Sequence, residues 1–171
     1  EHADLDAAAN GIVRSAFGLS GQKCSALSRL YVHEAVAHTL IAKLVEITAA
    51  LAIGDPTERG NWLGPVNNGS AYADYQSFVH QLCAGGAVMH AGGRVLTDGD
   101  MARGYFVTPV IVEAPLSNPL WRQELFLPIL MLHRVATKEQ AMALANDSEV
   151  GLTAGFYGSA EEVAWFHEHI E

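Results

Sequence analysis

The sequence has little of what several large protein classes require. It contains only two cysteines, Cys24 and Cys83. Two are too few for a disulfide framework, so we expect a cytoplasmic protein. No run reaches the roughly 18 apolar residues of a membrane-spanning helix, and no secretory signal opens the chain. We therefore expect no membrane partner.

Basic residues are also scarce. Ten lysines and arginines stand against nineteen aspartates and glutamates, which gives a formal net charge of −9 with eight neutral histidines. Because no basic face gathers in the sequence, nucleic acid is excluded as a partner. Gly-x-Gly-x-x-Gly, Walker and Gly-x-Ser-x-Gly motifs are all missing. The histidines lack a metal-ligand pattern, since His167 and His169 are two apart on a predicted helix, so we expect no metal site.

What the sequence does have is enough apolar material for one domain, with 171 residues of which 50% are hydrophobic. Helical spacing predicts helices at residues 4–17, 34–51, 70–84, 138–145 and 160–170, with Asp4, Thr137 and Ser159 suited to cap them. Extended apolar runs predict strands at residues 27–33, 87–90, 105–112, 129–135 and 152–157, with the run at 105–112 broken at Pro109. This alternation predicts an α/β fold, a mostly parallel twisted sheet flanked by helices, as a single domain over residues 1–171.

Cys24 is the leading candidate for chemistry. It follows Ser20-Gly21-Gln22-Lys23, and these small and polar neighbours leave its sulfur approachable. Backbone N–H groups of the turn, or a nearby Lys23, would favour the thiolate and could stabilise an oxyanion. The alternative is a packing role, because a lone free cysteine is more often a buried packing residue. We assign that packing role to Cys83, which lies beside Leu82 and Val79.

A second segment, Gln123-Glu124-Leu125-Phe126-Leu127-Pro128, combines a carboxylate and an aromatic ring with a proline that stiffens the chain. Taken alone, Glu124 would be interpreted as a solvated residue at the end of a strand, and Phe126 as a core residue. Together with Cys24, they suggest thiol chemistry beside a bound cofactor.

These segments resemble the aldehyde dehydrogenase superfamily. Residues 20–26 resemble its cysteine motif, with wording closest to the 1-pyrroline-5-carboxylate (glutamate semialdehyde) dehydrogenase branch of proline metabolism, and residues 124–128 are similar to its Glu-x-Phe-Gly-Pro motif. The likeness extends in order over the whole chain, through residues 3–8, 53–56, 63–65, 104–109 and 145–155.

The resemblance implies the catalytic domain of an NAD(P)-dependent enzyme that oxidises a small-molecule aldehyde to a carboxylate. Cys24 would be the catalytic nucleophile, passing through a thiohemiacetal and a thioester. Glu124 would bind the cofactor through the nicotinamide ribose hydroxyls, and Phe126 would pack near the nicotinamide. The parent protein would be a homo-oligomer.

The chain also departs from the family pattern. The general base and the cofactor domain of the family lie upstream of the cysteine, and a C-terminal segment lies downstream. We therefore expect a fragment of a longer chain that performs no NAD-linked turnover by itself. Leu127 stands where the family usually has glycine, so the contacts of Glu124 and Phe126 are expected to differ. Two alternatives stay open, a non-catalytic assembly domain of the same fold and a thiol hydrolase or acyltransferase without nicotinamide.

Overall fold

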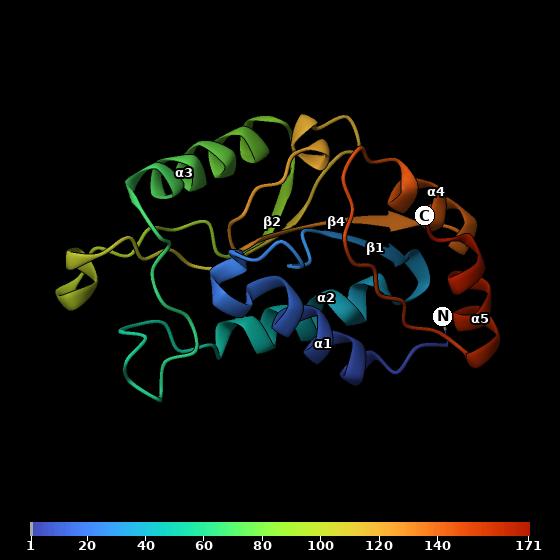
Figure 1. The fold of residues 1–171 in the computed structure, drawn as a ribbon, viewed down its shortest axis with the longest axis horizontal. Coiled ribbons are helices and arrows are strands. Elements are labelled where there is room, and N and C mark those ends of the chain that lie inside the picture. Colours follow the sequence, from blue (N-terminus) through green and yellow to red (C-terminus); the bar gives the residue numbers. More distant parts are fainter. Residues whose placement is uncertain (1) are drawn as a thin grey trace.

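A computed structural model describes residues 2–171, and it has a four-stranded sheet with helices on both faces (Figure 1). Strand β4 is central and runs parallel to both β1 and β3, while β2 pairs antiparallel with β3, which gives the order β1-β4-β3-β2. The strands are β1 (Arg29–His33), β2 (Val88–Ala91), β3 (Val110–Glu113) and β4 (Ile129–Val135). The helices are α1 (Leu5–Phe17), α2 (Glu34–Ala49), α3 (Gly69–Ala84), α4 (Lys138–Asn146) and α5 (Ala160–His169), with short helical turns at Gly18–Gly21, Gly99–Arg103 and Pro119–Arg122.

The core lies in two layers, one on each face of the sheet. Ile111, Leu130 and Leu132 pack with the residues of α1 and α2. Their neighbours Val110, Val112, Ile129 and Met131 belong to the other layer, with the residues of α3. Figure 1 shows α1 and α2 on one side of the sheet and α3 on the other. Successive side chains of a strand alternate between faces, so the buried parts of β3 and β4, Val110–Val112 and Ile129–Leu132, are apolar on both faces. This confirms the prediction of a mostly parallel, doubly covered sheet.

Helix caps define most of the element boundaries. The Asp4 carboxylate accepts hydrogen bonds from the N–H groups of Asp6 and Ala7 at 3.0 Å each. Thr137 caps α4 in the same way, and Ser159 forms a capping box with Glu162 at the start of α5. Each cap satisfies N–H groups that the first helical turn leaves without a partner. All three predicted caps are confirmed.

The predicted strand at residues 152–157 is wrong. This segment has no regular structure, and Leu152 is 67% exposed. It finds no strand partner among residues 2–171 and passes across α1 instead, where the Tyr157 hydroxyl lies 1.9 Å from the position of a Cβ on Gly11. An extended run needs a neighbour to satisfy its backbone groups before it forms a strand.

The extended run at residues 105–112 is interrupted at Pro109, as predicted, because Pro109 has no N–H to donate, and the strand itself begins at Val110. Before it, Val107 makes only an isolated bridge with Val95. Cys83, predicted to be a packing residue, is exposed on α3. Leu82 takes the buried position of that helical turn instead and is fully enclosed.

Candidate active site

The turn that leads to Cys24 follows directly on α1 and is left-handed. Leu19, Ser20 and Gly21 have φ angles of 53°, 56° and 70°. The Gln22 N–H closes the turn by donating to the Leu19 carbonyl at 3.1 Å. A left-handed conformation costs a residue other than glycine about 1–2 kcal/mol, so Leu19 and Ser20 are both strained. Such strain persists only where the surroundings hold it in place.

Side-chain hydrogen bonds fix this turn to a neighbouring loop. The Ser20 hydroxyl donates to the Gly64 carbonyl at 2.9 Å. The Gln22 side chain donates to the Leu19 carbonyl at 3.1 Å and accepts from the Asn67 N–H at 2.8 Å. The turn is thus tied at two points to residues about 45 positions away in the sequence.

Cys24 stands at the corner of a second turn, which the Ala26 N–H closes on the Lys23 carbonyl at 3.0 Å. Its side chain is exposed, as its small and polar neighbours indicated. Within residues 2–171 the Cys24 N–H has no hydrogen-bond partner, so it can donate to an oxygen that approaches the sulfur. The Lys23 ammonium is turned back over Gly18, 3.3 Å from the position that a Cβ there would occupy.

The loop before β4 presents the second predicted motif. Leu125 and Leu127 are buried, while Glu124 and Phe126 between them are exposed. Phe126 has a positive φ of 55° and a side chain that is 45% exposed. The residue with unusual backbone geometry is therefore Phe126 and not Leu127, which packs into the core beside α3. Leucine at position 127 is compatible with the fold because its own φ is not left-handed.

Gly21 joins the two loops. A Cβ on Gly21 would lie 2.3 Å from the carbonyl oxygen of Leu127 and 2.8 Å from the nitrogen of Pro128, closer than real Cβ atoms come. The backbones of the cysteine turn and of the 124–128 loop therefore touch at a position that only glycine can occupy. The structure thus places Cys24 on one of these loops, and Glu124 and Phe126 on the other.

An open pocket lies beside Phe126, against the amino end of α3. Asn68 caps this helix by accepting from the Ala71 N–H at 2.8 Å. No role was predicted for Asn68 or its neighbours at the start of α3, although an asparagine before a helical run signals a cap. No local signal could have placed them beside Phe126. The pocket is lined by Asn67, Asn68, Ser70, Ala71, Asp74, Leu125, Phe126 and Leu127.

Comparison with known proteins identifies the family. The sequence model of the aldehyde dehydrogenase family matches residues 1–171. The chain belongs to the aldehyde dehydrogenase family. It is 40% identical over 154 residues to a 1-pyrroline-5-carboxylate dehydrogenase of Bacillus cytotoxicus, and 38% identical over 156 residues to that of Bacillus thuringiensis strain Al Hakam. Both alignments cover 90% of this chain, which spans 29% of the length of these relatives.

Solved structures of related proteins share the fold. PnpE in complex with nicotinamide adenine dinucleotide aligns with a TM-score of 0.96 and 28% identity, over 99% of this chain and 35% of that one. An NADP-dependent enzyme of E. coli aligns with a TM-score of 0.93 and 32% identity, over 100% of this chain and 35% of that one. The predicted fold, of the aldehyde dehydrogenase catalytic-domain type, is thereby confirmed.

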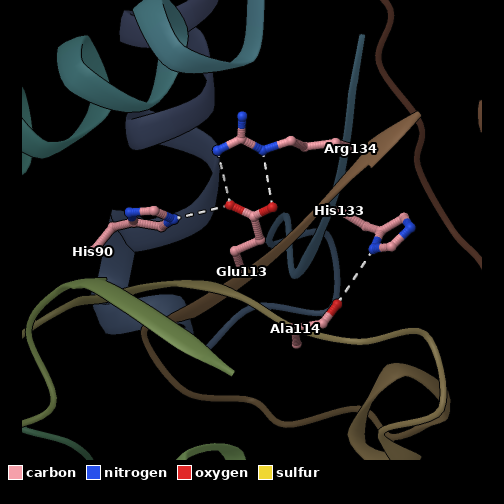
Figure 2. Close-up of polar contacts among 5 residues, drawn as sticks. All are labelled: His90, Glu113, Ala114, His133 and Arg134. Carbon is pink, nitrogen blue, oxygen red and sulfur yellow. Dashed lines mark hydrogen bonds and ion pairs between the residues drawn. The ribbon is translucent and has the colours of Figure 1, made fainter. Parts of the chain in front are cut away.

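A second polar cluster of this aldehyde dehydrogenase chain lies at the carboxyl ends of β3 and β4. Figure 2 shows its side chains. The Glu113 carboxylate, at the end of β3, accepts from Arg134 Nε at 2.9 Å and from a terminal Arg134 nitrogen at 3.1 Å. His90 Nε2 lies 3.2 Å from the same carboxylate, because a bulge between Met89 and Ala91 re-aims it. Hydrogen bonds from Arg134 are the largest of the effects that lower the pKa of Glu113.

This cluster ties three strands together and lies away from the cysteine turn. Figure 2 shows His133 turned away from Glu113 toward the Ala114 carbonyl, 3.3 Å from His133 Nδ1. Within residues 2–171, no three His, Cys, Asp or Glu side chains group so that they could hold a metal ion. In the same part of the chain, none of the helices combines the length and apolar character needed to cross a membrane.

Proposed function

We propose that this chain is the thiol-bearing catalytic part of an NAD(P)-dependent aldehyde dehydrogenase. The observation that carries the proposal is the backbone contact of Gly21 with Leu127 and Pro128. That contact joins the loop that carries the exposed Cys24 to the loop that carries the exposed Glu124 and Phe126. It supports the proposal because a nucleophile and a cofactor-binding surface must be near one another if a bound aldehyde is to react at both.

In this proposal Cys24 is the nucleophile. Its sulfur attacks the aldehyde carbon, and the carbonyl oxygen becomes an oxyanion that accepts a hydrogen bond from the Cys24 N–H. The product of this step is a thiohemiacetal on Cys24. When bound, the nicotinamide supplies the acceptor for the hydride that oxidation removes. Water then releases the carboxylate from the thioester that remains on Cys24.

The residues of the 124–128 loop suit a nicotinamide nucleotide. Glu124 is exposed and, within residues 2–171, has neither an ion pair nor a hydrogen-bond partner. A free carboxylate can accept from the two hydroxyls of a ribose. Phe126 offers a half-exposed ring, held outward by its positive φ and by its buried neighbours on either side. We therefore assign Glu124 to the ribose and Phe126 to packing against the nicotinamide.

We propose glutamate semialdehyde as the substrate. Support comes from the relatives named 1-pyrroline-5-carboxylate dehydrogenase at 38–40% identity, and from the Gly-Gln-Lys-Cys-Ser-Ala wording of residues 21–26. Both cysteines of this chain are exposed, so Cys83 serves as an internal reference when the reactivity of the Cys24 thiol is tested.

The test is acylation by p-nitrophenyl acetate at pH 7, followed by peptide mass spectrometry of both cysteines. We expect Cys24 to be acylated at least ten times faster than Cys83, since the loss of one oxyanion donor typically costs about 10²–10³ in rate. The release of p-nitrophenolate should disappear in Cys24→Ser and persist in Cys83→Ser. Glutamate semialdehyde should protect Cys24 at lower concentrations than propionaldehyde does. Equal rates at the two cysteines would refute the nucleophile, and equal protection would refute the substrate.

A further inference from the structure

The left-handed turn before Cys24 needs an anchor that its first left-handed residue, Leu19, does not supply. Leu19 is strained by its positive φ, yet its side chain is 69% exposed and buries little to offset that strain. Strained residues cluster at functional sites, and the surrounding structure must hold them. The holding contact must therefore come from one of the next residues of the turn.

Ser20 has the features of that anchor. It is 3% exposed, and only three polar residues in the described part of the chain are buried, namely Ser20, Thr48 and Asn118. Its hydroxyl donates to the Gly64 carbonyl at 2.9 Å, across 44 positions of sequence. A buried hydroxyl that reaches a distant carbonyl fixes the local backbone, because breaking the bond leaves the buried hydroxyl without a partner.

The acceptor belongs to a loop that is itself held in place. The residue before it, Leu63, is 2% exposed, and its carbonyl accepts from the Gly54 N–H at 3.0 Å. Leu63 also forms a bridge with Ile53. These contacts hold Gly64 in place, so the hydrogen bond from the Ser20 hydroxyl to Gly64 also holds the turn in place.

We infer that Ser20 is a positioning residue, whose bond to Gly64 holds the left-handed turn so that the Cys24 N–H faces an oxyanion at the thiol. This inference rests on the proposed function, which makes Cys24 the nucleophile. Alanine at position 20 lacks the hydroxyl and disfavours a φ of 56°, so the turn relaxes and the chain leading to Cys24 is redirected. Glycine lacks the hydroxyl but accepts the same φ without strain, so it retains more of the geometry.

The experiment compares two reactions of Cys24 in the full chain. Acylation by p-nitrophenyl acetate passes through an oxyanion, as the sulfur adds to the carbonyl and p-nitrophenolate leaves. Alkylation by iodoacetamide displaces iodide and forms no oxyanion. The ratio of the two rates therefore reports the donor geometry and not merely the exposure of the sulfur. Ser117→Ala, at an exposed serine, is the matched control.

We expect Ser20→Ala to lower the acylation rate of Cys24 at least tenfold while its alkylation rate changes less than twofold. Ser20→Gly should fall between Ser20→Ala and the parent chain, and Ser117→Ala should match the parent. An unchanged ratio in both Ser20 variants would overturn the inference, even with a fast parent Cys24. A parent Cys24 that acylates no faster than Cys83 would instead refute the proposed function. If Ser20→Ala fails to fold by circular dichroism, the ratio in Ser20→Gly decides.

Discussion

Replacing Gly21 with alanine tests whether backbone contact joins the two loops. The new Cβ would lie 2.3 Å from the Leu127 carbonyl oxygen and 2.5 Å from its carbon. These are backbone atoms of the residue that leads into Pro128, so no side-chain rotation can relieve the overlap. Alanine must also adopt a φ of 70°.

The expected cost has two parts. A left-handed alanine costs about 1–2 kcal/mol relative to glycine, and overpacking a close contact adds about 1–3 kcal/mol. We expect the free energy of unfolding to fall by about 3 kcal/mol. For a chain of this size, that corresponds to a fall of roughly 6–12 °C in Tm.

Two other glycines separate these parts. Gly86 has a φ of 78° but no atom within 4 Å of the position of a Cβ, so Gly86→Ala carries the conformational cost alone. Gly60 has neither a positive φ nor a neighbour within 4 Å. Urea unfolding should therefore rank the free energies of unfolding as Gly60→Ala above Gly86→Ala above Gly21→Ala. The first should lie within about 0.5 kcal/mol of the parent.

The comparison of Gly21→Ala with Gly86→Ala decides the question. If both lose the same free energy of unfolding, the 124–128 loop yields to the added methyl group at no cost, and the two loops are not rigidly joined. If Gly21→Ala loses more, its Cys24 should also be acylated more slowly, because the methyl group pushes the cysteine turn away from Leu127. A larger loss of stability with unchanged acylation would refute the link between this contact and the thiol.

Two further predictions concern titratable groups. Glu113→Gln should lower the free energy of unfolding by about 1–2 kcal/mol at pH 7, since it removes charge-assisted hydrogen bonds to Arg134. Because the pKa of Glu113 is held below its usual 4.5, the difference in free energy of unfolding between the parent and Glu113→Gln should shrink as the pH falls below about 4.5. A difference that does not change with pH would contradict this prediction. Tyr75→Phe should cost about 1 kcal/mol at pH 7, because the Tyr75 hydroxyl donates to the Thr108 carbonyl at 2.6 Å. Burial raises the pKa of Tyr75 to about 12, so the folded parent should lose stability between pH 10 and 12. Urea unfolding at each pH should show a steeper fall in the free energy of unfolding for the parent than for the Phe variant. Parallel curves would contradict this prediction.

The predictable features of this fold are those that a few neighbouring residues encode. The apolar run at residues 129–135 signals a strand buried on both faces, and β4 has these bounds. Capping side chains such as Asp4 and Ser159 act within three residues, so sequence alone locates them. Residues 152–157 have the composition of a strand, but strand formation depends on a partner that composition does not reveal.

The contacts that sequence could not predict connect distant positions. Ser20 meets Gly64, and Gly21 meets Leu127, only because the topology brings their loops to one edge of the sheet. Glu113 lies between Arg134 and His90 because three strands align in a particular register. The resemblance to the family predicts roles for Cys24 and Glu124, but the spacing of residues within the motifs does not indicate that their loops touch at Gly21.

The cysteine turn lies at one end of the parallel strands, and this position explains why backbone contacts determine how the two loops are placed. Open α/β sheets commonly bind ligands at the carboxyl ends of their strands, and that edge holds the ion pair of Glu113. The cysteine turn and the 124–128 loop instead precede the amino ends of β1 and β4.

At that amino edge, backbone hydrogen bonds join the loops directly to the neighbouring strands. The Val110 N–H donates to the Pro128 carbonyl at 2.8 Å, and the Met131 N–H donates to the Ser28 carbonyl at 3.0 Å. Both loops are thus extensions of the parallel ladder, and the spacing of adjacent strands sets their separation. It follows that substitutions at Gly21 should disturb the site more than exchanges of exposed polar side chains around it.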